Sequence, residues 1–184
     1  MTSIFLILLE RMGRAISTLP NFADIQNSIT VIIIYVMFTL ALGWQSGFLQ
    51  WELCPSRKIA TRIILTSLFA PAILEELFFR VLLLPAPSDK IPFNSYLAWS
   101  GFSLLLFVVY HPLNALIFFP QGRAVFFNPI FLILATALGV VCIITYWQTA
   151  SLSIPVVIHW LAVVLWLLCF GGLTKLNYKL AETK

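Results

Sequence analysis

Charged residues are scarce in this 184-residue chain. Asp, Glu, Lys and Arg make up 10% of it, whereas a soluble domain contains roughly 25%. Hydrophobic residues account for 61%, and the mean hydropathy is +0.99. A chain of this composition cannot cover a surface that faces water, which excludes an ordinary soluble domain. Its net charge of +4 does not indicate nucleic-acid binding, because the basic residues lie in the gaps between apolar runs.

Cysteine is also rare. Cys54, Cys142 and Cys169 are an odd number, and no two of them form a CxxC pair. This excludes a disulfide framework or a structural zinc site as the basis of the fold. The N-terminal stretch MTSIFLILLERMGR lacks both a leading basic residue and a small-residue cleavage site. We therefore expect no removable signal peptide. No repeat or low-complexity linker divides the chain, which predicts one membrane-embedded domain.

Long apolar runs are what the sequence does contain, and a membrane-spanning helix needs roughly 20 such residues. Five stretches approach this length: Ile29 to Leu49, Ile59 to Leu84, Tyr96 to Phe119, Asn128 to Gln148 and Ile154 to Gly171. We therefore predict an all-α fold, a polytopic transmembrane helix bundle. Its predicted parts are an N-terminal segment (1–28), a membrane-embedded domain (29–174, motif core 59–171) and a basic tail (175–184).

The segment from Ile4 to Ile16 differs from these five runs. It mixes apolar residues with Glu10, Arg11 and Arg14. This pattern favours an amphipathic helix lying at the membrane interface over a sixth span.

The distribution of Lys and Arg predicts an orientation, because these residues concentrate on the cytoplasmic side of a membrane. With five spans, one side collects seven of them: Arg57, Lys58, Arg62, Arg123, Lys175, Lys179 and Lys184. The other side collects Arg11, Arg14 and Lys90. We expect an integral, multi-pass membrane protein with its C-terminus in the cytoplasm.

A small set of ionisable residues falls inside the apolar runs. They are Glu75, Glu76 and Arg80 in the second run, with His111 and His159, the chain's two histidines, in the third and fifth. An ionisable side chain at bilayer depth costs at least ~2.5 kcal/mol, so such groups usually face a protein interior and have a function there.

Helical spacing gives the two glutamates different roles. Glu76 and Arg80 are four residues apart and share a helix face, so they can form an ion pair. Glu75 points about 100° away around the helix, and one turn on it meets Phe79, which offers no partner. We predict that Glu76 and Arg80 hold the structure while Glu75 stays available. The simpler alternative is that Glu75 also shares Arg80.

A glutamate and two histidines from three helices can together catalyse hydrolysis. Glutamate and histidine exchange protons with water, and a donor can stabilise the oxyanion that forms when water attacks a carbonyl. The residues Glu75, His111 and His159 therefore suggest peptide hydrolysis within a membrane. Taken singly, each histidine could instead be a helix-packing residue.

Prolines lie close to these positions. Pro71, Pro112 and Pro155 each lack the N–H that a helix uses, which favours kinks or local opening. Pro155 is near a helix start, where proline is common. Pro112 follows His111 directly, which makes it the stronger candidate for shaping a water-accessible cavity.

Three motifs resemble those of the CPBP family of CAAX proteases and bacteriocin-processing enzymes, also called the Abi or type II CAAX prenyl endopeptidase family. EELFFR at Glu75 to Arg80 matches EExxxR, and FVVYH at Phe107 to His111 matches FxxxH. HWLAV at His159 to Val163 matches HxxxN except that valine replaces asparagine. The resemblance spans about Ile59 to Gly171.

The resemblance implies an intramembrane protease of the glutamate type. Glu75 would activate the water with help from His111, His159 would donate to the oxyanion, and Glu76 and Arg80 would orient the site. The family's asparagine assists at the oxyanion, and Val163 cannot. Losing one oxyanion donor costs ~100-fold or more in rate.

Other classes of function stay open at this stage. A zinc-dependent membrane peptidase would use Glu75, His111 and His159 as ligands, although no HExxH motif is present. A non-catalytic scaffold or immunity-type module is favoured by Val163, and a transporter is disfavoured by the lack of an inverted repeat. We expect no cofactor, with zinc as the alternative. The expected partners are membrane lipids and a membrane-associated or lipidated peptide or protein substrate, not nucleic acid.

Asn114 is a possible auxiliary polar group, because it follows His111 by three residues and lies on a neighbouring helix face. We hypothesise that it compensates for Val163 at the oxyanion. Asn114→Ala should then lower the rate of peptide cleavage, and an unchanged rate would count against this role.

Overall fold

The chain folds almost entirely into helices. The computed structural model describes residues 4–89 and 91–176. Its elements are α1 (Ile4–Ser17), α2 (Phe22–Gln45), α3 (Arg57–Ser67), η1 (Leu68–Ile73), α4 (Leu74–Glu76), η2 (Leu77–Leu82), η3 (Pro87–Asp89), α5 (Phe93–Ile117), η4 (Pro120–Gly122), α6 (Arg123–Phe126), α7 (Pro129–Thr149), α8 (Ser153–Cys169) and α9 (Gly172–Lys175). Over these residues no strand forms, and the one β-bridge joins Glu52 to Phe170. The predicted all-α class is confirmed.

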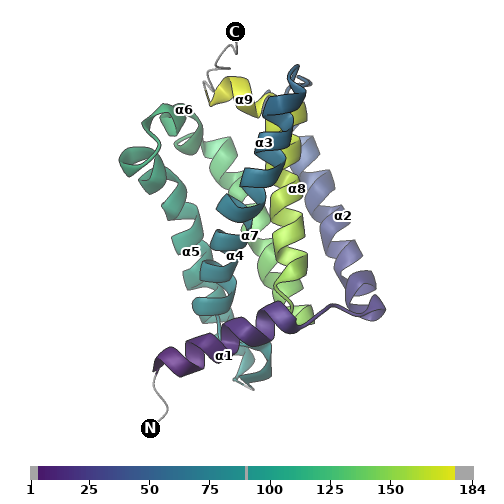
Figure 1. The fold of residues 1–184 in the computed structure, drawn as a ribbon, viewed down its shortest axis with the longest axis vertical. Coiled ribbons are helices and arrows are strands. Elements are labelled where there is room, and N and C mark those ends of the chain that lie inside the picture. The colour runs from purple at the N-terminus through teal and green to yellow at the C-terminus, as the bar shows by residue number, and fades with distance from the viewer. Residues whose placement is uncertain (1–3, 90, 177–184) are drawn as a thin grey trace.

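Five stretches of helix run along the length of the molecule as a bundle (Figure 1). They are α2, the consecutive pieces from α3 to η2, α5, α7 and α8. Among the described helices, α2, α5 and α7 are long and apolar enough to cross a membrane, and α8 is a shorter apolar helix. The protein is therefore an integral membrane helix bundle. The number of crossings stays a prediction.

Helix α2 begins seven residues before the apolar run predicted from Ile29. Its start is fixed by a capping box: the Asn21 side chain accepts from the backbone N–H of Asp24, and the Asp24 carboxylate accepts from that of Asn21, both at 2.9 Å. Hydropathy identified the middle of this helix and missed its polar first turns. Helix α2 therefore crosses residue 28, the predicted boundary between the N-terminal segment and the membrane-embedded domain.

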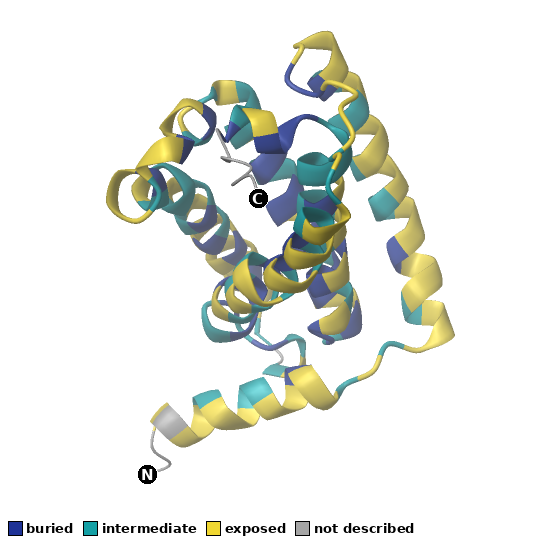
Figure 2. Ribbon diagram, turned by 45° about the horizontal axis from the view of Figure 1, so that its top comes forward, coloured by how far each residue is buried: buried dark blue, intermediate teal, exposed yellow. Residues whose placement is uncertain are grey.

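Helix α7 occupies the centre of the bundle, and α2 lies at its edge. Helix α7 packs against α2, α5 and α8. Half of its most apolar stretch is buried, compared with 6% of that of α2. Figure 2 shows α2 exposed along most of its length. Its exposed residues include Ile33, Ile34 and Met37, so this helix offers an apolar surface suited to lipid.

Helix α1 lies across one end of the bundle, at a steep angle to the other helices (Figure 1). Arg11 binds Asp89 at 2.7 Å, and the backbone N–H of Leu152 donates to the carbonyl of Ala15 at 3.0 Å. Met12 and Ala15 also pack into the main hydrophobic cluster. The helix is therefore attached both to η3 and to the turn between α7 and α8. Its position at a membrane interface stays a prediction.

The motif-bearing stretch from α3 to η2 is irregular. Its backbone leaves helical geometry at Ala70 (φ −130°, ψ 112°), directly before Pro71, which has no N–H to donate. Elements η1 and η2, on either side of the short α4, are wide π-type turns, which occur frequently at functional sites. Helix α5, in contrast, continues through Pro112 to Ile117. The interruption thus lies in the second predicted span and not in the third.

Candidate active site

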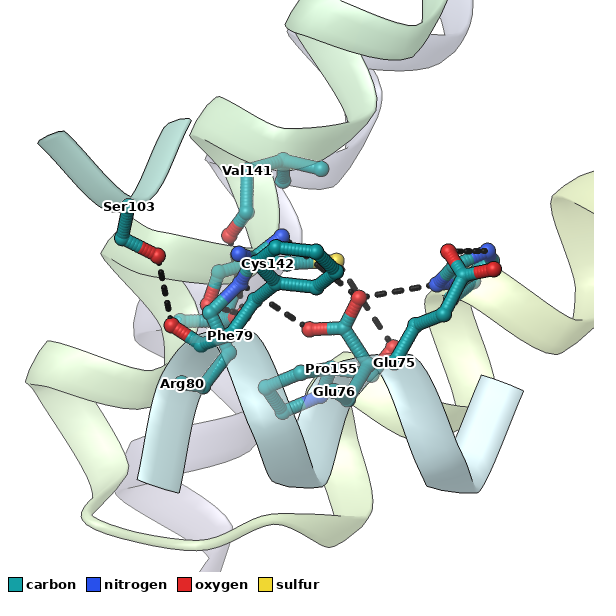
Figure 3. A network of polar contacts seen from close by, with 10 residues as sticks. Glu75, Glu76, Phe79, Arg80, Ser103, Val141, Cys142 and Pro155 are labelled. Carbon is teal, nitrogen blue, oxygen red and sulfur yellow. Dashed lines mark hydrogen bonds and ion pairs between the residues drawn. The ribbon is translucent and has the colours of Figure 1, made fainter. Parts of the chain in front are cut away.

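The five ionisable residues come from three parts of the bundle. Glu75 and Glu76 belong to α4 and Arg80 to η2, while His111 lies on α5 and His159 on α8. Because α8 packs against α3 and η1, the structure brings His159 against both glutamates. Figure 3 shows Glu75, Glu76 and Arg80 projecting from one stretch of helix into this polar network.

Glu76 and Arg80 form the ion pair that their spacing predicted. The Arg80 Nε atom lies 3.0 Å from Glu76 Oε2, and neither side chain has any exposed surface. The Arg80 Cζ atom lies 5.0 Å from the centroid of the Phe107 ring, which gives a cation–π contact. Each charge thus has a direct partner in a region where an unpaired charge would be costly.

His159 extends this pair towards Glu75. Its Nδ1 atom lies 2.8 Å from Glu76 Oε1, and its Nε2 atom lies 3.9 Å from Glu75 Oε2. An ionised carboxylate can only accept hydrogen bonds, so Nδ1 carries the proton that bonds Glu76. This contact fixes the orientation of the ring and leaves Nε2 directed at Glu75. Glu76 therefore orients His159 as well as pairing with Arg80.

Glu75 has a different environment from its neighbour in sequence. Its side chain is 12% exposed, whereas that of Glu76 is fully buried. Glu75 Oε2 has no hydrogen-bond partner among the described residues. The contact at 3.9 Å to His159 is too long for a direct hydrogen bond. Glu75 is thus the carboxylate of the pair that is available to bind a water molecule.

His111 is held separately, within a group of aromatic rings. Its Nδ1 atom donates to the backbone carbonyl of Phe107 at 2.8 Å, which leaves Nε2 as an acceptor in the neutral ring. In the described part of the chain, no hydrogen bond or ion pair joins His111 to Glu75 or His159. Its predicted help to Glu75 therefore needs a bridging molecule, and this role stays a prediction.

The other predicted positions do not complete a donor or ligand set. Asn114 is half-buried on α5, and its side chain makes no hydrogen bond to the cluster within the described residues. Val163 lies one turn after His159 on α8 and is also half-buried. Over the described residues, no three His, Cys, Asp or Glu side chains are placed to hold a metal ion. The auxiliary role of Asn114 and the zinc alternative both stay predictions.

Phe107 has a central place in the site, although the sequence assigned it no role beyond the first position of FVVYH. Its buried ring lies edge-to-face with Phe79, His111 and His159, at centroid distances of 5.2, 4.9 and 6.0 Å. It therefore contacts both histidines and also Arg80, whose Cζ atom lies 5.0 Å from the ring centroid. The signal was present in FVVYH, where Phe107 precedes His111 by one helical turn.

Comparison with protein families connects this geometry to a known group. The family model described as type II CAAX prenyl endopeptidase Rce1-like matches residues 57–165, which is more than half of the chain.

The chain belongs to the Rce1-like family.

The Rce1-like match begins with α3 and ends within α8, so it contains all five cluster residues, while α1 and α2 lie outside it. Neither a curated protein nor a solved structure matches the chain. The predicted resemblance to the CAAX proteases is confirmed. This membership indicates a membrane protease of the CAAX type, and the residues that act are a separate question.

The different burial of the two carboxylates predicts different mutational effects on stability. Arg80→Ala should lower the free energy of unfolding by about 3–5 kcal/mol, because it leaves Glu76 buried without its cation. Glu75→Gln is nearly isosteric and removes no direct partner, so it should leave stability almost unchanged. Thermal unfolding and the yield of monodisperse protein in detergent measure both effects.

Arg14→Ala provides the matched control, because the side chains of its ion pair with Glu10 are 50% and 66% exposed. This change should cost at most about 1 kcal/mol. Equal losses in Arg80→Ala and Glu75→Gln would refute the division of roles between the carboxylates.

Proposed function

We propose that this protein is an intramembrane endopeptidase in which Glu75 activates the attacking water. The observation that carries this proposal is the line of contacts from Arg80 through Glu76 to His159, which ends with Nε2 of His159 facing Glu75. A buried support of this kind holds a donor, His159 Nε2, 3.9 Å from a base, Glu75 Oε2. Membership of a CAAX prenyl endopeptidase family supports the same reaction.

In the proposed reaction Glu75 removes a proton from water as the water oxygen attacks the peptide carbonyl. The carbonyl oxygen then carries negative charge and accepts a hydrogen bond from Nε2–H of protonated His159. Glu75 returns its proton to the leaving amine, which completes the hydrolysis. Glu76 stabilises the positive charge of His159 through Nδ1, at 2.8 Å.

Arg80 and Phe107 act on this reaction indirectly. The guanidinium of Arg80 binds one carboxylate oxygen of Glu76, and the other oxygen accepts from His159. The Phe107 ring contacts Arg80 and both histidines. His111 directs a free Nε2 from beyond this ring, and we propose that it helps to place the water beside Glu75.

The proposed substrate class is supported by the family and by the apolar surface of α5. We propose a peptide or protein that reaches the site from the membrane, either membrane-associated or lipidated. The description of the matching family names a prenyl endopeptidase, and exposed apolar residues such as Leu105, Val109 and Leu113 cover the outside of α5. Membrane lipids are the other expected partners, and no nucleic acid is expected.

The ends of the bundle support a cytoplasmic C-terminus. The start of α3, together with α6 and α9, is found at the end of the bundle opposite to α1 (Figure 1). They carry the basic residues Arg57, Lys58, Arg62, Arg123 and Lys175. Lys90, Lys179 and Lys184, and most of the predicted tail 175–184, lie outside the described residues. We propose five spans, with the basic end in the cytoplasm and α1 at the opposite interface.

The proposed chemistry is tested by cleavage of a peptide mixture that includes prenylated C-terminal peptides. Mass spectrometry should find products with purified wild-type protein in detergent, and Glu75→Gln should abolish them because glutamine cannot take a proton from water. Glu10→Gln, which changes an exposed carboxylate outside the cluster, should leave cleavage intact.

Two further outcomes of the same assay are informative. Products that disappear with chelator and return with added zinc would favour the zinc peptidase with Glu75, His111 and His159 as ligands. Folded wild-type protein that yields no product would favour a non-catalytic module, in line with the valine at position 163.

The orientation is tested by labelling single cysteines in intact bacterial cells that produce the protein. Cys54 and Cys169 are first replaced by serine, while Cys142 is fully buried and can remain. A membrane-impermeant maleimide should label Ser17→Cys, at the end of α1, and should fail to label Gln121→Cys until the cells are opened. The reverse pattern would place the basic end outside the cytoplasm.

A further inference from the structure

Ser103 joins α5 to the helix that carries the two glutamates. Its side chain is fully buried, and its Oγ donates a hydrogen bond to the backbone carbonyl of Phe79 at 2.6 Å. Figure 3 shows this bond next to Arg80, at the opposite side of the network from Glu75. The contact links residues 24 positions apart in sequence, so it fixes one helix relative to another.

The Phe79 carbonyl needs such a donor because η2 ends at Leu82. The last carbonyls of a helix have no N–H partner further along the same helix. The N–H of Leu83 donates to Phe78, at 3.2 Å, and the bond from Ser103 serves the next carbonyl. In a bundle surrounded by lipid, a carbonyl without a partner is costly, so this hydrogen bond anchors the end of η2.

Arg80 directly follows the anchored residue, and its side chain is fully buried. Its guanidinium binds Glu76 and lies against the Phe107 ring. Its Nη1 atom has no hydrogen-bond partner among the described residues. The place of the guanidinium therefore depends on the backbone of η2 as well as on these contacts.

We propose that Ser103 is a positioning residue of the site. By holding the Phe79 carbonyl it sets the place of Arg80, and Arg80 in turn holds the carboxylate of Glu76 that orients His159. The consequence for catalysis rests on the proposed function. The effect on His159 is independent of the proposed function, because it concerns the contact between Glu76 and His159 within the protein.

Ser100 offers a matched control on the same helix. It lies one turn before Ser103 and is also buried, with 7% of its surface exposed. Its Oγ has no hydrogen-bond partner among the described residues. Ser100→Ala therefore removes a buried hydroxyl of the same kind without removing a bond to η2.

The test observes His159 directly by nuclear magnetic resonance. The chain contains two histidines, so full-length protein labelled with ¹⁵N-histidine and purified in detergent gives two sets of ring signals. His111→Gln identifies which set belongs to His159. Glu76→Gln shows where the His159 Nδ1–H signal moves when its carboxylate partner is replaced.

In Ser103→Ala the His159 Nδ1–H signal should move towards its position in Glu76→Gln, or be lost through exchange with water. Ser100→Ala should leave it at the wild-type position. An unchanged His159 signal in folded Ser103→Ala would overturn the proposal. Where the substrate is cleaved, kcat of Ser103→Ala should fall between about tenfold and 100-fold with KM unchanged.

Ser103→Cys separates positioning from packing and also covers the case in which Ser103→Ala does not fold. Cysteine is a weaker donor and a larger, more apolar side chain than serine. If Ser103 is a positioning residue, the His159 Nδ1–H signal of Ser103→Cys should lie between the signals of wild type and Ser103→Ala. If Ser103→Ala does not fold, the signal of Ser103→Cys should still differ from that of wild type. A wild-type signal in Ser103→Cys would overturn the proposal. Absence of cleavage by wild-type protein would refute the proposed function, but it would not affect the proposal that Ser103 sets the orientation of His159.

Discussion

A buried charge that must be balanced within the bilayer is the constraint on which this structure depends. Arg80 and Glu76 have no exposed surface, so neither can rely on water. Glu76 meets this constraint by binding Arg80 with one carboxylate oxygen and His159 with the other. The contact with His159 requires α8 to lie against the helix that carries Glu76, so satisfying the charge also determines how these two helices pack. The candidate site and the core of the bundle are therefore the same set of contacts.

Two adjacent carboxylates acquire different chemistry because they point in different directions from one irregular helix. Glu76 is enclosed and has two partners within 3.0 Å, whereas Glu75 is slightly exposed and lies 3.9 Å from His159. The wide turns of η1 and η2 and the break before Pro71 surround this pair. Regular helix on either side would be simpler to form, so the irregular backbone is consistent with a requirement of the site.

Much of the fold follows from the sequence because a helix that crosses lipid needs a run of roughly 20 apolar residues. Hydropathy identified all five long segments, and the spacing of Glu76 and Arg80 predicted their ion pair, since both depend on residues close together in the chain. The start of α2 was missed because Asn21 and Asp24 are polar, although they cap that helix. The bond from Glu76 to His159 spans 83 positions, and helical periodicity carries no information about such a contact. The roles assigned to Glu75, His111 and His159 remain predictions, because a site's geometry does not establish its reaction.

The attachment of α1 also bears on how the protein is made. The carbonyl of Ala15, near the start of the chain, accepts a hydrogen bond from Leu152, at the turn that precedes the last long helix. Ala15 is synthesised well before Leu152, since synthesis proceeds from the N-terminus. The bond between Ala15 and Leu152 can therefore form only after α7 has been made, whereas the ion pair of Arg11 with Asp89 can form earlier. Helix α1 is therefore fixed to the bundle in two steps, first at η3 and later at the turn between α7 and α8, and its apolar face and basic residues suit contact with the membrane surface in the interval.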